Sequence, residues 1–301
     1  MNTDIEPVLI GESPVMRRLL NAAKVVAATD VNVLLLGESG SGKETLARAL
    51  HCWSPRASGS FLRLHCAGLD EAPDLPAICE HGQADGTLFL DEVAELTPRG
   101  QAGLLRCLEQ LEGGRNGPAL RVIAATAQDL GVLVEEGRFR RDLYHRLCVV
   151  PLELPPLRER LSDIPLLLDH FITGAAHEHG LPAPQLRAGA VRLLKRYAWP
   201  GNLRELRNIC ERLVILLPDG VVTPSNLPAE IRAAEAPEGM GLDGALGFRL
   251  PPNGIDLAQL EGEVIRQALT MAEGNKSRAA RLLGLSRDTF LYRLRKHLAE
   301  A

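Results

Sequence analysis

Two groups of residues in the first hundred positions have the types and spacing to handle a nucleoside triphosphate. The stretch GESGSGKET, residues 37–45, matches the pattern G-x-x-x-x-G-K and ends in Lys43 and two further residues. Glycines let backbone N–H groups wrap a phosphate, and a lysine at this place reaches the β- and γ-phosphates. Asp91 and Glu92 follow the apolar run TLFL. In such sites the first acid holds Mg²⁺, directly or through water, and the second orients the attacking water.

Taken alone, the glycine stretch is also compatible with a turn that binds nothing, and the two acids with an ordinary solvated pair. Together they predict an ATP site that uses Mg²⁺. One feature is unusual, because Glu44 follows Lys43 where the Ser or Thr that binds Mg²⁺ usually stands, and Thr45 comes one place later. The candidate ATP-binding residues of the loop are Gly37, Glu38, Ser39, Gly40, Ser41, Gly42, Lys43, Glu44 and Thr45.

The elements that must position these residues follow from the apolar pattern. The strand candidates are VNVLLLG (31–37), SFLRLHCA (60–67), TLFLDE (87–92), ALRVIAATAQ (119–128) and LCVVPLEL (147–154). The stretches between them that show helical spacing include ETLARALHCW (44–53) and RGQAGLLRCLEQLEG (99–113). Strands that alternate with helices predict an α/β fold with a mainly parallel sheet covered on both faces.

Beyond Pro155 and Pro156 the strand signal stops, and helical runs divided by Pro and Gly take over. A stretch rich in Gly, Pro and Ala then reads as a linker. The predicted organisation is an α/β nucleotide-binding domain over 1–155, a helical unit over 156–232, a linker over 233–255 and a DNA-binding domain over 256–301.

The C-terminal end is basic although the whole chain has a net charge of −4. The runs KSRAARLLG and RDTFLYRLRKHL are joined at Gly284, and Ser286 is a good N-cap for the second. A helix, a short glycine turn and a basic helix predict a helix-turn-helix that binds double-stranded DNA, although a solvated basic helix in a bundle would look similar. The residues expected to meet DNA are Lys276, Arg278, Arg287, Asp288, Thr289, Tyr292, Arg293 and Lys296.

Within that set, Arg287 and Arg293 are expected to read bases, and Lys276, Arg278 and Lys296 to meet phosphates. The packing face of the same module is expected to include Ala279, Ala280, Leu282, Leu283, Phe290, Leu291, Leu294 and Leu298. Such modules usually dimerise, and the preceding helix offers an apolar seam of Leu257, Leu260, Val264, Ile265 and Leu269.

No stretch approaches the roughly 18 apolar residues that span a bilayer, and the N-terminus has no signal-peptide core. These features predict a cytoplasmic protein with no membrane partner. The chain begins almost at the ATPase motif, so regulation is expected from a partner regulator, from expression level or from nucleotide itself rather than from an N-terminal regulatory domain.

Seven motifs make a more specific identification. IGESPVMRRLL, LLLGESGSGKE, ADGTLFLDEV, EEGRFRRDLYHRL, LPPLRERLSDI, WPGNLRELRN and GNKSRAARLLGLSRDTFLYRLRKH follow one another in that order. Together they resemble the bacterial enhancer-binding proteins, the AAA+ activators of sigma-54 RNA polymerase, over about 8–232 and 255–298. The resemblance implies an AAA+ P-loop sheet, a helical lid and a Fis-type helix-turn-helix, with subunits that assemble into rings. It also accounts for Glu44, because the loop of this family normally reads GKE.

The resemblance also assigns roles by position. Arg140 and Arg146 match the arginines that reach a neighbour's γ-phosphate, and with Asp91 and Glu92 they complete the predicted catalytic set. Arg204 matches the lid arginine that senses nucleotide, and Thr126 belongs to a sensor pair at the end of the fourth strand. The implied partners are RNA polymerase and further copies of the chain, from a dimer to a hexamer.

The sequence departs from the family pattern in three places, which lie along the line from the γ-phosphate to the loop that would touch the sigma factor. The segment between the second and third strands has no Gly-Ala-Phe-Thr-Gly-Ala loop, which in the family touches the sigma factor. His65 replaces the Asn that normally holds the catalytic Glu, and an imidazole can hydrogen-bond Glu92 with a different geometry. Ala127 replaces the Asn of the sensor pair, and Gln128 is shifted by one residue toward the other face.

Three hypotheses follow. The first is a DNA-bound transcription regulator whose AAA+ domain binds ATP and oligomerises without remodelling sigma-54 polymerase. The second is an ATP-hydrolysing activator of sigma-54 promoters that uses another surface or a partner subunit. The third is a decayed paralogue with no output.

Overall fold

The computed structural model describes residues 9–67, 86–112, 120–233, 257–272 and 274–298. Contacts divide the chain into two compact units, residues 1–235 and 236–301. The segment in which the family carries its sigma-54 loop lies mostly in residues 68–85, outside the described residues. The finer domain boundaries, at 155 and 232, stay predictions.

A parallel sheet of five strands forms the centre of the first unit, in the order β2-β3-β4-β1-β5. The strands are β1 (Val33–Leu36), β2 (Phe61–His65), β3 (Gly86–Asp91), β4 (Leu120–Thr126) and β5 (Val150–Glu153). Four of them fall within one of the predicted apolar runs, and β3 begins one residue before its predicted run, at Gly86. Because β4 lies between β1 and β3, the loop that follows β1 and the acids that end β3 flank the carboxyl end of β4.

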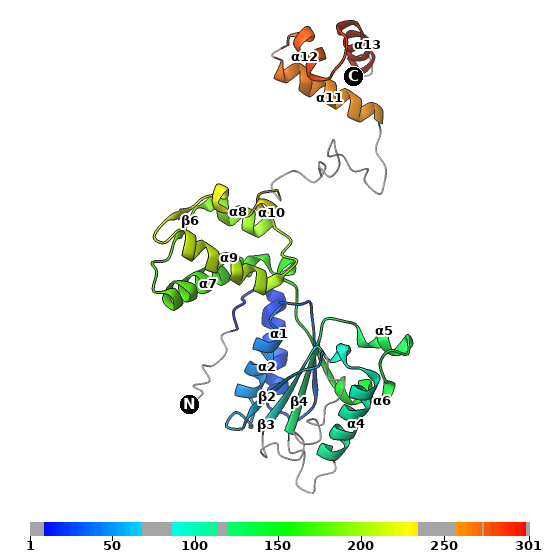
Figure 1. Ribbon diagram of the computed structural model, residues 1–301, viewed down its shortest axis with the longest axis vertical. Coiled ribbons are helices and arrows are strands. Elements are labelled where there is room, and N and C mark those ends of the chain that lie inside the picture. The colour runs from blue at the N-terminus through cyan, green and yellow to red at the C-terminus, as the bar shows by residue number, and fades with distance from the viewer. Residues whose placement is uncertain (1–8, 68–85, 113–119, 234–256, 273, 299–301) are drawn as a thin grey trace. The chain divides into compact units, whose positions relative to one another are not determined.

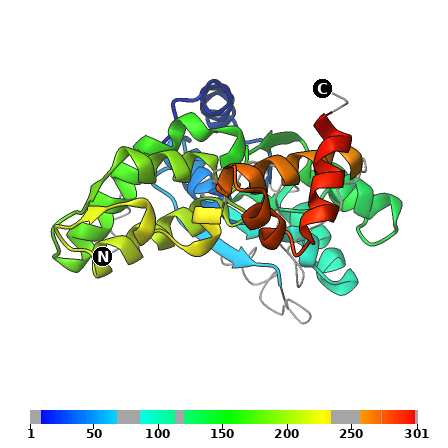
Figure 2. The same ribbon diagram turned by 90° about the horizontal axis from the view of Figure 1, so that it is seen from above.

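Helices cover both faces of this sheet, which confirms the predicted α/β class. Successive strand residues point to opposite faces. On one face, Val33 and Leu35 pack with α1 (Pro14–Ala27) and α2 (Lys43–Cys52). On the other, Leu34 and Leu88 pack with α4 (Pro98–Glu112), α5 (Leu130–Glu135) and α6 (Arg141–Leu147). Figure 1 shows the two helical layers on either side of the sheet, and Figure 2 shows β2, in light blue, at its outer edge.

The remainder of the first unit is the lid. It contains α7 (Ile164–His179), α8 (Ala188–Arg196), α9 (Asn202–Leu216) and α10 (Ala229–Ala233), with one-turn 3₁₀ helices η2 (Leu157–Glu159), η3 (Leu161–Asp163) and η4 (Pro224–Asn226). Its core closes around Trp199, which is fully buried and donates from Nε1 to the Leu194 carbonyl at 2.8 Å.

One expectation for the lid is wrong, because it is not wholly helical. The strands β6 (Gln185–Leu186) and β7 (Val221–Val222) pair in parallel and tie the start of α8 to the end of α9. Two residues each are too few to show the alternation by which a strand is recognised in a sequence.

The second unit contains α11 (Leu257–Met271), α12 (Lys276–Leu282) and α13 (Arg287–Leu298) around a core that includes Ile265, Ala279, Phe290 and Leu294. Gly284 has a φ of +65° in the turn between α12 and α13. The predicted cap is confirmed, because Ser286 Oγ accepts from the Thr289 N–H at 3.2 Å. Leu282, expected to pack, is 51% exposed, because it lies on the solvent side of α12, away from the buried pair Ala279 and Ala280.

Candidate functional site

The phosphate loop is shaped by its glycines. Gly40 and Gly42 have φ values of +76° and +106°, which favour glycine, and Gly42 is the N-cap of α2. A Cβ at Gly40 would collide with the carbonyl oxygen of Gly201 in the lid, so the close approach of the two segments also requires glycine. The loop therefore presents backbone N–H groups and a helix N-terminus in the arrangement that binds phosphate.

Lys43 ties this loop to the end of β3. Its Nζ donates to the carbonyl oxygens of Gly37 at 2.8 Å and Glu38 at 3.3 Å, and lies 3.1 Å from Glu92 Oε1. The Lys43 side chain is 6% exposed and that of Glu92 is 20% exposed, so the ion pair lies in a shielded part of the site. The predicted lysine and the predicted base are thus brought into direct contact.

Glu92 is fixed on both of its carboxylate oxygens. It has a φ of +54° at the start of η1 (Val93–Glu95), and its Oε2 accepts from the Ala127 N–H at 3.0 Å. The backbone of the residue that replaces the family's sensor Asn therefore holds the acid. Thr126 is fully buried, and its Oγ1 accepts from the Gln128 N–H at 3.0 Å, which shapes the same turn.

The expected contact between His65 and Glu92 is wrong. His65 pairs in register with Asp91 on the neighbouring strand, and its Nδ1 lies 3.7 Å from Asp91 Oδ2. The register places the imidazole beside the acid directly opposite, one residue short of Glu92.

Asp91 has a second basic neighbour. Arg63 Nη2 lies 2.7 Å from Asp91 Oδ2, and Arg63 Nη1 lies 2.7 Å from Glu44 Oε2. The carboxylate of Asp91 suits Mg²⁺, which takes few protein ligands and keeps several waters. Thr45, the nearest hydroxyl residue in the sequence after Lys43, lines a small cavity next to the loop.

Residues of the lid hold four successive residues of the loop, Glu38 to Ser41. Arg158 makes a double contact with the Glu38 carboxylate at 2.9 and 2.6 Å, and Asn202 Nδ2 donates to the same carboxylate at 3.0 Å. Arg158, and then Asn202, lower the pKa of Glu38 to about 2.

The other three loop residues are held mainly through their backbone. Ser39 O accepts from Asn202 Nδ2 at 3.2 Å, Gly40 O accepts from the Leu203 N–H at 2.9 Å, and Ser41 O accepts from Arg160 Nη2 at 3.0 Å. The candidate sensor Arg204 donates from Nη1 to Ser39 Oγ at 3.0 Å. We call these bonds, with those to Glu38, the loop–lid contacts.

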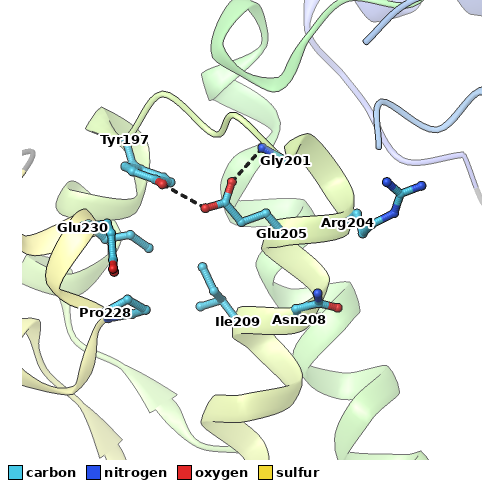
Figure 3. Close-up of a pocket in the computed structure, with 9 residues that line it drawn as sticks. Tyr197, Gly201, Arg204, Glu205, Asn208, Ile209, Pro228 and Glu230 are labelled. Carbon is cyan, nitrogen blue, oxygen red and sulfur yellow. Dashed lines mark hydrogen bonds between the residues drawn. The ribbon is translucent and has the colours of Figure 1, made fainter. Parts of the chain in front are cut away.

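Asn202 and Arg204 lie in the first turn of α9. Glu205 holds this turn by accepting from the Tyr197 hydroxyl and the Gly201 N–H, both at 2.9 Å. Burial, and then Glu205, raise the pKa of Tyr197 to about 12. Figure 3 shows Glu205 directed toward Tyr197 and Gly201 and the Arg204 guanidinium directed away from them, and Arg204 is also among the residues that line the adjoining cleft of about 350 Å³.

A small cavity of about 80 Å³ adjoins the loop on its apolar side. Two buried polar atoms of its lining, Ser41 Oγ and Arg160 Nε, have no hydrogen-bond partner within the described part of the chain. Apolar walls combined with unused polar atoms are typical of sites that bind small molecules. Sequence reasoning missed most of this lining, which is Leu9, Ile10, Met16, Ser41, Gly42, Thr45, Leu154, Arg160, Leu167, His170, Phe171 and Leu203.

The two candidate arginines for a neighbour's phosphate lie at α6. Arg140 is exposed and makes a double contact with Asp142 at 3.0 and 2.7 Å. Arg146 is 32% exposed, and its Nη2 lies 3.4 Å from Glu109 Oε1. Partial exposure suits groups that meet another subunit, and their role at a phosphate stays a prediction.

In the second unit, the residues expected to meet DNA are exposed: Lys276, Arg278, Arg287, Asp288, Thr289, Tyr292, Arg293 and Lys296. Arg293 differs from the others, because its Nη1 lies 2.6 Å from Glu261 Oε1 on α11. A base-reading role for Arg293 therefore requires that this ion pair break. The interactions described include no ion pair of Arg287, so the same role for Arg287 does not require one to break.

The predicted seam on α11 is only partly available. Leu257 and Val264 are 72% and 39% exposed, but Ile265 is 2% exposed and belongs to the core of the unit. The expectation that Ile265 faces a partner is wrong, because α12 and α13 already cover that side of the helix. Met271, 70% exposed and seven residues after Val264, extends the exposed line instead.

Three segments of the chain match known protein families. Residues 10–157 match the sigma-54 interaction domain, residues 158–241 the AAA+ ATPase lid domain, and residues 256–297 the bacterial regulatory proteins of the Fis family. Within the described residues, no helix is long and apolar enough to cross a membrane.

Relatives cover nearly the whole chain. The transcriptional regulatory protein ZraR of Escherichia coli K12 is 39% identical over 309 residues, which span 95% of this chain and 68% of that protein. The DNA-binding transcriptional regulator NtrC of Azospirillum brasilense is 36% identical over 331 residues, spanning 95% and 69%. The crystal structure of NtrX from Brucella abortus in complex with ADP has a TM-score of 0.68 at 33% identity and covers 98% of this chain and 70% of its own. NtrX in complex with ATP gives 0.66 at 33% identity, covering 97% and 70%.

Proposed function

The chain belongs to the bacterial enhancer-binding proteins, the AAA+ activators of sigma-54 RNA polymerase, and on that basis we propose a function that departs from the family's usual one. We propose that it is a sequence-specific DNA-binding regulator whose AAA+ domain binds ATP and oligomerises but does not itself remodel sigma-54 polymerase. The observation that carries the proposal is the short connection between β2 and β3. It retains no Gly-Ala-Phe-Thr-Gly-Ala sequence, while the phosphate loop and the helix-turn-helix are both complete.

Nucleotide binding is supported by the geometry of the loop. Backbone N–H groups of the loop and of the start of α2 would hold the phosphates, and Lys43 would neutralise the β- and γ-phosphates. Arg204, which reaches the loop from the lid, would respond to the same charge. ATP in complex with NtrX gives the corresponding precedent in a relative. Mg²⁺, held by Asp91, would supply positive charge to the triphosphate.

Hydrolysis depends on Glu92, and both of its carboxylate oxygens already have a partner. One oxygen pairs with Lys43 and the other with the Ala127 N–H. A base that orients water needs a carboxylate lone pair directed at that water, so these two contacts reduce the lone pairs that remain for it. A move of Lys43 from Glu92 to the triphosphate would favour turnover, and the side-chain amide that would otherwise assist is absent from residue 127.

Assembly would bring α6 of one subunit to the ATP of the next. Arg140 and Arg146 are the guanidinium groups proposed to stabilise phosphate charge across that interface, in a homo-oligomer between a dimer and a hexamer. On DNA, the second unit would pair with a second copy and place α13 in the major groove. RNA polymerase is the proposed downstream partner, with a partner regulator as one source of control.

The test begins with ATP turnover by the purified chain. We expect turnover indistinguishable from that of the Lys43→Ala variant, together with nucleotide binding that only the unmodified chain shows. Genome-wide DNA occupancy would then show which sigma factor serves the bound promoters. Activation of a sigma-54 promoter in vitro by this chain alone would refute the proposal.

A second candidate function is an ATP-hydrolysing activator of sigma-54 promoters that acts through another surface or a partner subunit. It is favoured by the retention of Asp91, Glu92, Arg140 and Arg146 together. Turnover clearly above the Lys43→Ala variant, rising with protein concentration as a shared site demands, would select it over the first.

A further inference from the structure

A basic residue outside the recognised motif roles bridges the two acids nearest the metal position. Arg63, on β2, contacts Glu44 Oε2 with Nη1 and Asp91 Oδ2 with Nη2, each at 2.7 Å. Glu44 directly follows Lys43, where P-loop enzymes usually place a metal ligand, and Asp91 is the acid proposed to hold Mg²⁺. The Arg63 guanidinium therefore contacts the acid at each of these two positions.

The strand register fixes this arrangement. Residues two apart on a strand share a face, so Arg63 lies beside His65, and His65 pairs with Asp91. The Arg63 side chain is 46% exposed, but Asp91 is 15% exposed, so the contact lies at the shielded rim of the site. Because side chains alternate between the two faces of β2, Arg63 and His65 both lie on the face that meets Asp91.

The charge balance explains what the contact does. Two carboxylates beside a phosphate loop repel a triphosphate, and Mg²⁺ normally relieves that repulsion. A guanidinium is always protonated and matches carboxylates with its planar fork, so Arg63 offsets both acids without a metal ion. The same contact uses an Asp91 oxygen that a metal ion would otherwise draw on.

We propose that Arg63 is a built-in cation that shares Asp91 with Mg²⁺, so that this chain binds nucleotide with little dependence on Mg²⁺. The inference rests on the proposed ATP site and adds a property of that site. It also makes Arg63 a positioning residue, since it acts on the nucleotide through Glu44 and Asp91.

The test compares nucleotide affinity with and without the metal ion. The dissociation constant of N-methylanthraniloyl-ATP is measured by fluorescence anisotropy in EDTA and in saturating Mg²⁺, for the unmodified chain and for Arg63→Gln. We expect the two constants of the unmodified chain to agree within about threefold, and those of Arg63→Gln to differ by about tenfold or more, equal to about 1.4 kcal/mol. Mn²⁺ titrated against the protein with ATP, followed by electron paramagnetic resonance, should bind more tightly to Arg63→Gln.

Arg48→Gln is the matched control. Arg48 also pairs with Glu44, at 3.0 Å, and is 41% exposed, but its partners in the described structure do not include Asp91. Its Mg²⁺ dependence should equal that of the unmodified chain. Arg63→Lys keeps the charge but lacks the planar fork that meets Glu44 and Asp91 with separate nitrogens, so its dependence should fall between those of the unmodified chain and Arg63→Gln.

Each outcome has one reading. An Mg²⁺ dependence that is unchanged in Arg63→Gln, or that is already tenfold in the unmodified chain, overturns the role of Arg63 and leaves the ATP site standing. Binding by the unmodified chain no better than by Lys43→Ala, at any Mg²⁺ concentration, refutes the proposed ATP site and the role of Arg63 with it.

Discussion

Replacing Asn202 by alanine should lower the stability of the first unit and loosen its phosphate loop. Asn202 is fully buried, accepts from the Leu157 N–H at 2.8 Å, and donates to Glu38 Oε2 at 3.0 Å and Ser39 O at 3.2 Å. The Asn202 side chain thus joins η2, α9 and the phosphate loop. Its φ of +49° is a conformation that Asn tolerates and alanine does not favour.

The magnitude follows from two losses. The Leu157 N–H would be buried without a partner, which costs about 1–3 kcal/mol. The left-handed backbone costs alanine roughly 1–2 kcal/mol. We therefore expect a loss of about 3 kcal/mol, and a melting temperature lower by roughly 6–12 °C for a unit of this size.

Thermal unfolding followed by circular dichroism measures the change, and anisotropy with N-methylanthraniloyl-ATP measures the loop. Asn202→Gly separates the two losses, because glycine removes the strain but not the orphaned N–H, so it should melt between alanine and the unmodified chain. Asn208→Ala is the matched control. Asn208 is exposed on the same helix, and its replacement should change the melting temperature by less than about 2 °C.

Equal melting temperatures for Asn202→Ala and Asn208→Ala would refute this reasoning. So would a large loss of stability with unchanged nucleotide affinity, since that would separate the lid from the phosphate loop.

Three further predictions concern charge, DNA and assembly. The folded pKa of Glu38, about 2, lies below its usual 4.5, so its contribution to stability is present above pH 4.5 and is lost as pH falls toward 2; Glu38→Gln should flatten the fall in melting temperature over that window. Arg287→Ala should weaken specific DNA binding by about 1–3 kcal/mol, and more than Arg293→Ala, when both are measured by titration at fixed salt. Val264→Asp should remove the part of the self-association that depends on the second unit, measured by analytical ultracentrifugation, while that unit stays folded, whereas Ile265→Asp should unfold it.

The fold was predictable where burial is continuous along the chain. Strands such as β3 and β4 are buried on both faces, as parallel strands covered by helices are, and their mainly apolar runs stand out in the sequence. The cap at Ser286 was predictable for another reason, since it depends only on residues within one turn. Patterns among neighbouring residues thus predict where these strands lie and where the helix after Ser286 begins.

The site was predictable in its chemistry but not in its pairings. Lys43 and Glu92 were expected in one site, yet their direct contact depends on how β1 and β3 flank β4. The bond between Arg158 and Glu38 joins residues 120 positions apart, which no local pattern records. Arg63 had a usable signal, because its position two residues before His65 places both on one face of β2.

Lys43 is the point at which these separate contacts meet. Its single charge is divided among the Gly37 and Glu38 carbonyls and the Glu92 carboxylate, and the Glu38 side chain is in turn held by the lid. A triphosphate that draws Lys43 toward itself must therefore weaken the hold on Glu92 and disturb the residue to which the lid is attached. In the family pattern an Asn on β2 restrains the catalytic acid, whereas here His65 lies beside Asp91 and cannot take that part. Here Lys43 and the Ala127 N–H hold Glu92 instead, so binding of a triphosphate and release of the acid would be coupled through the Lys43 ammonium group.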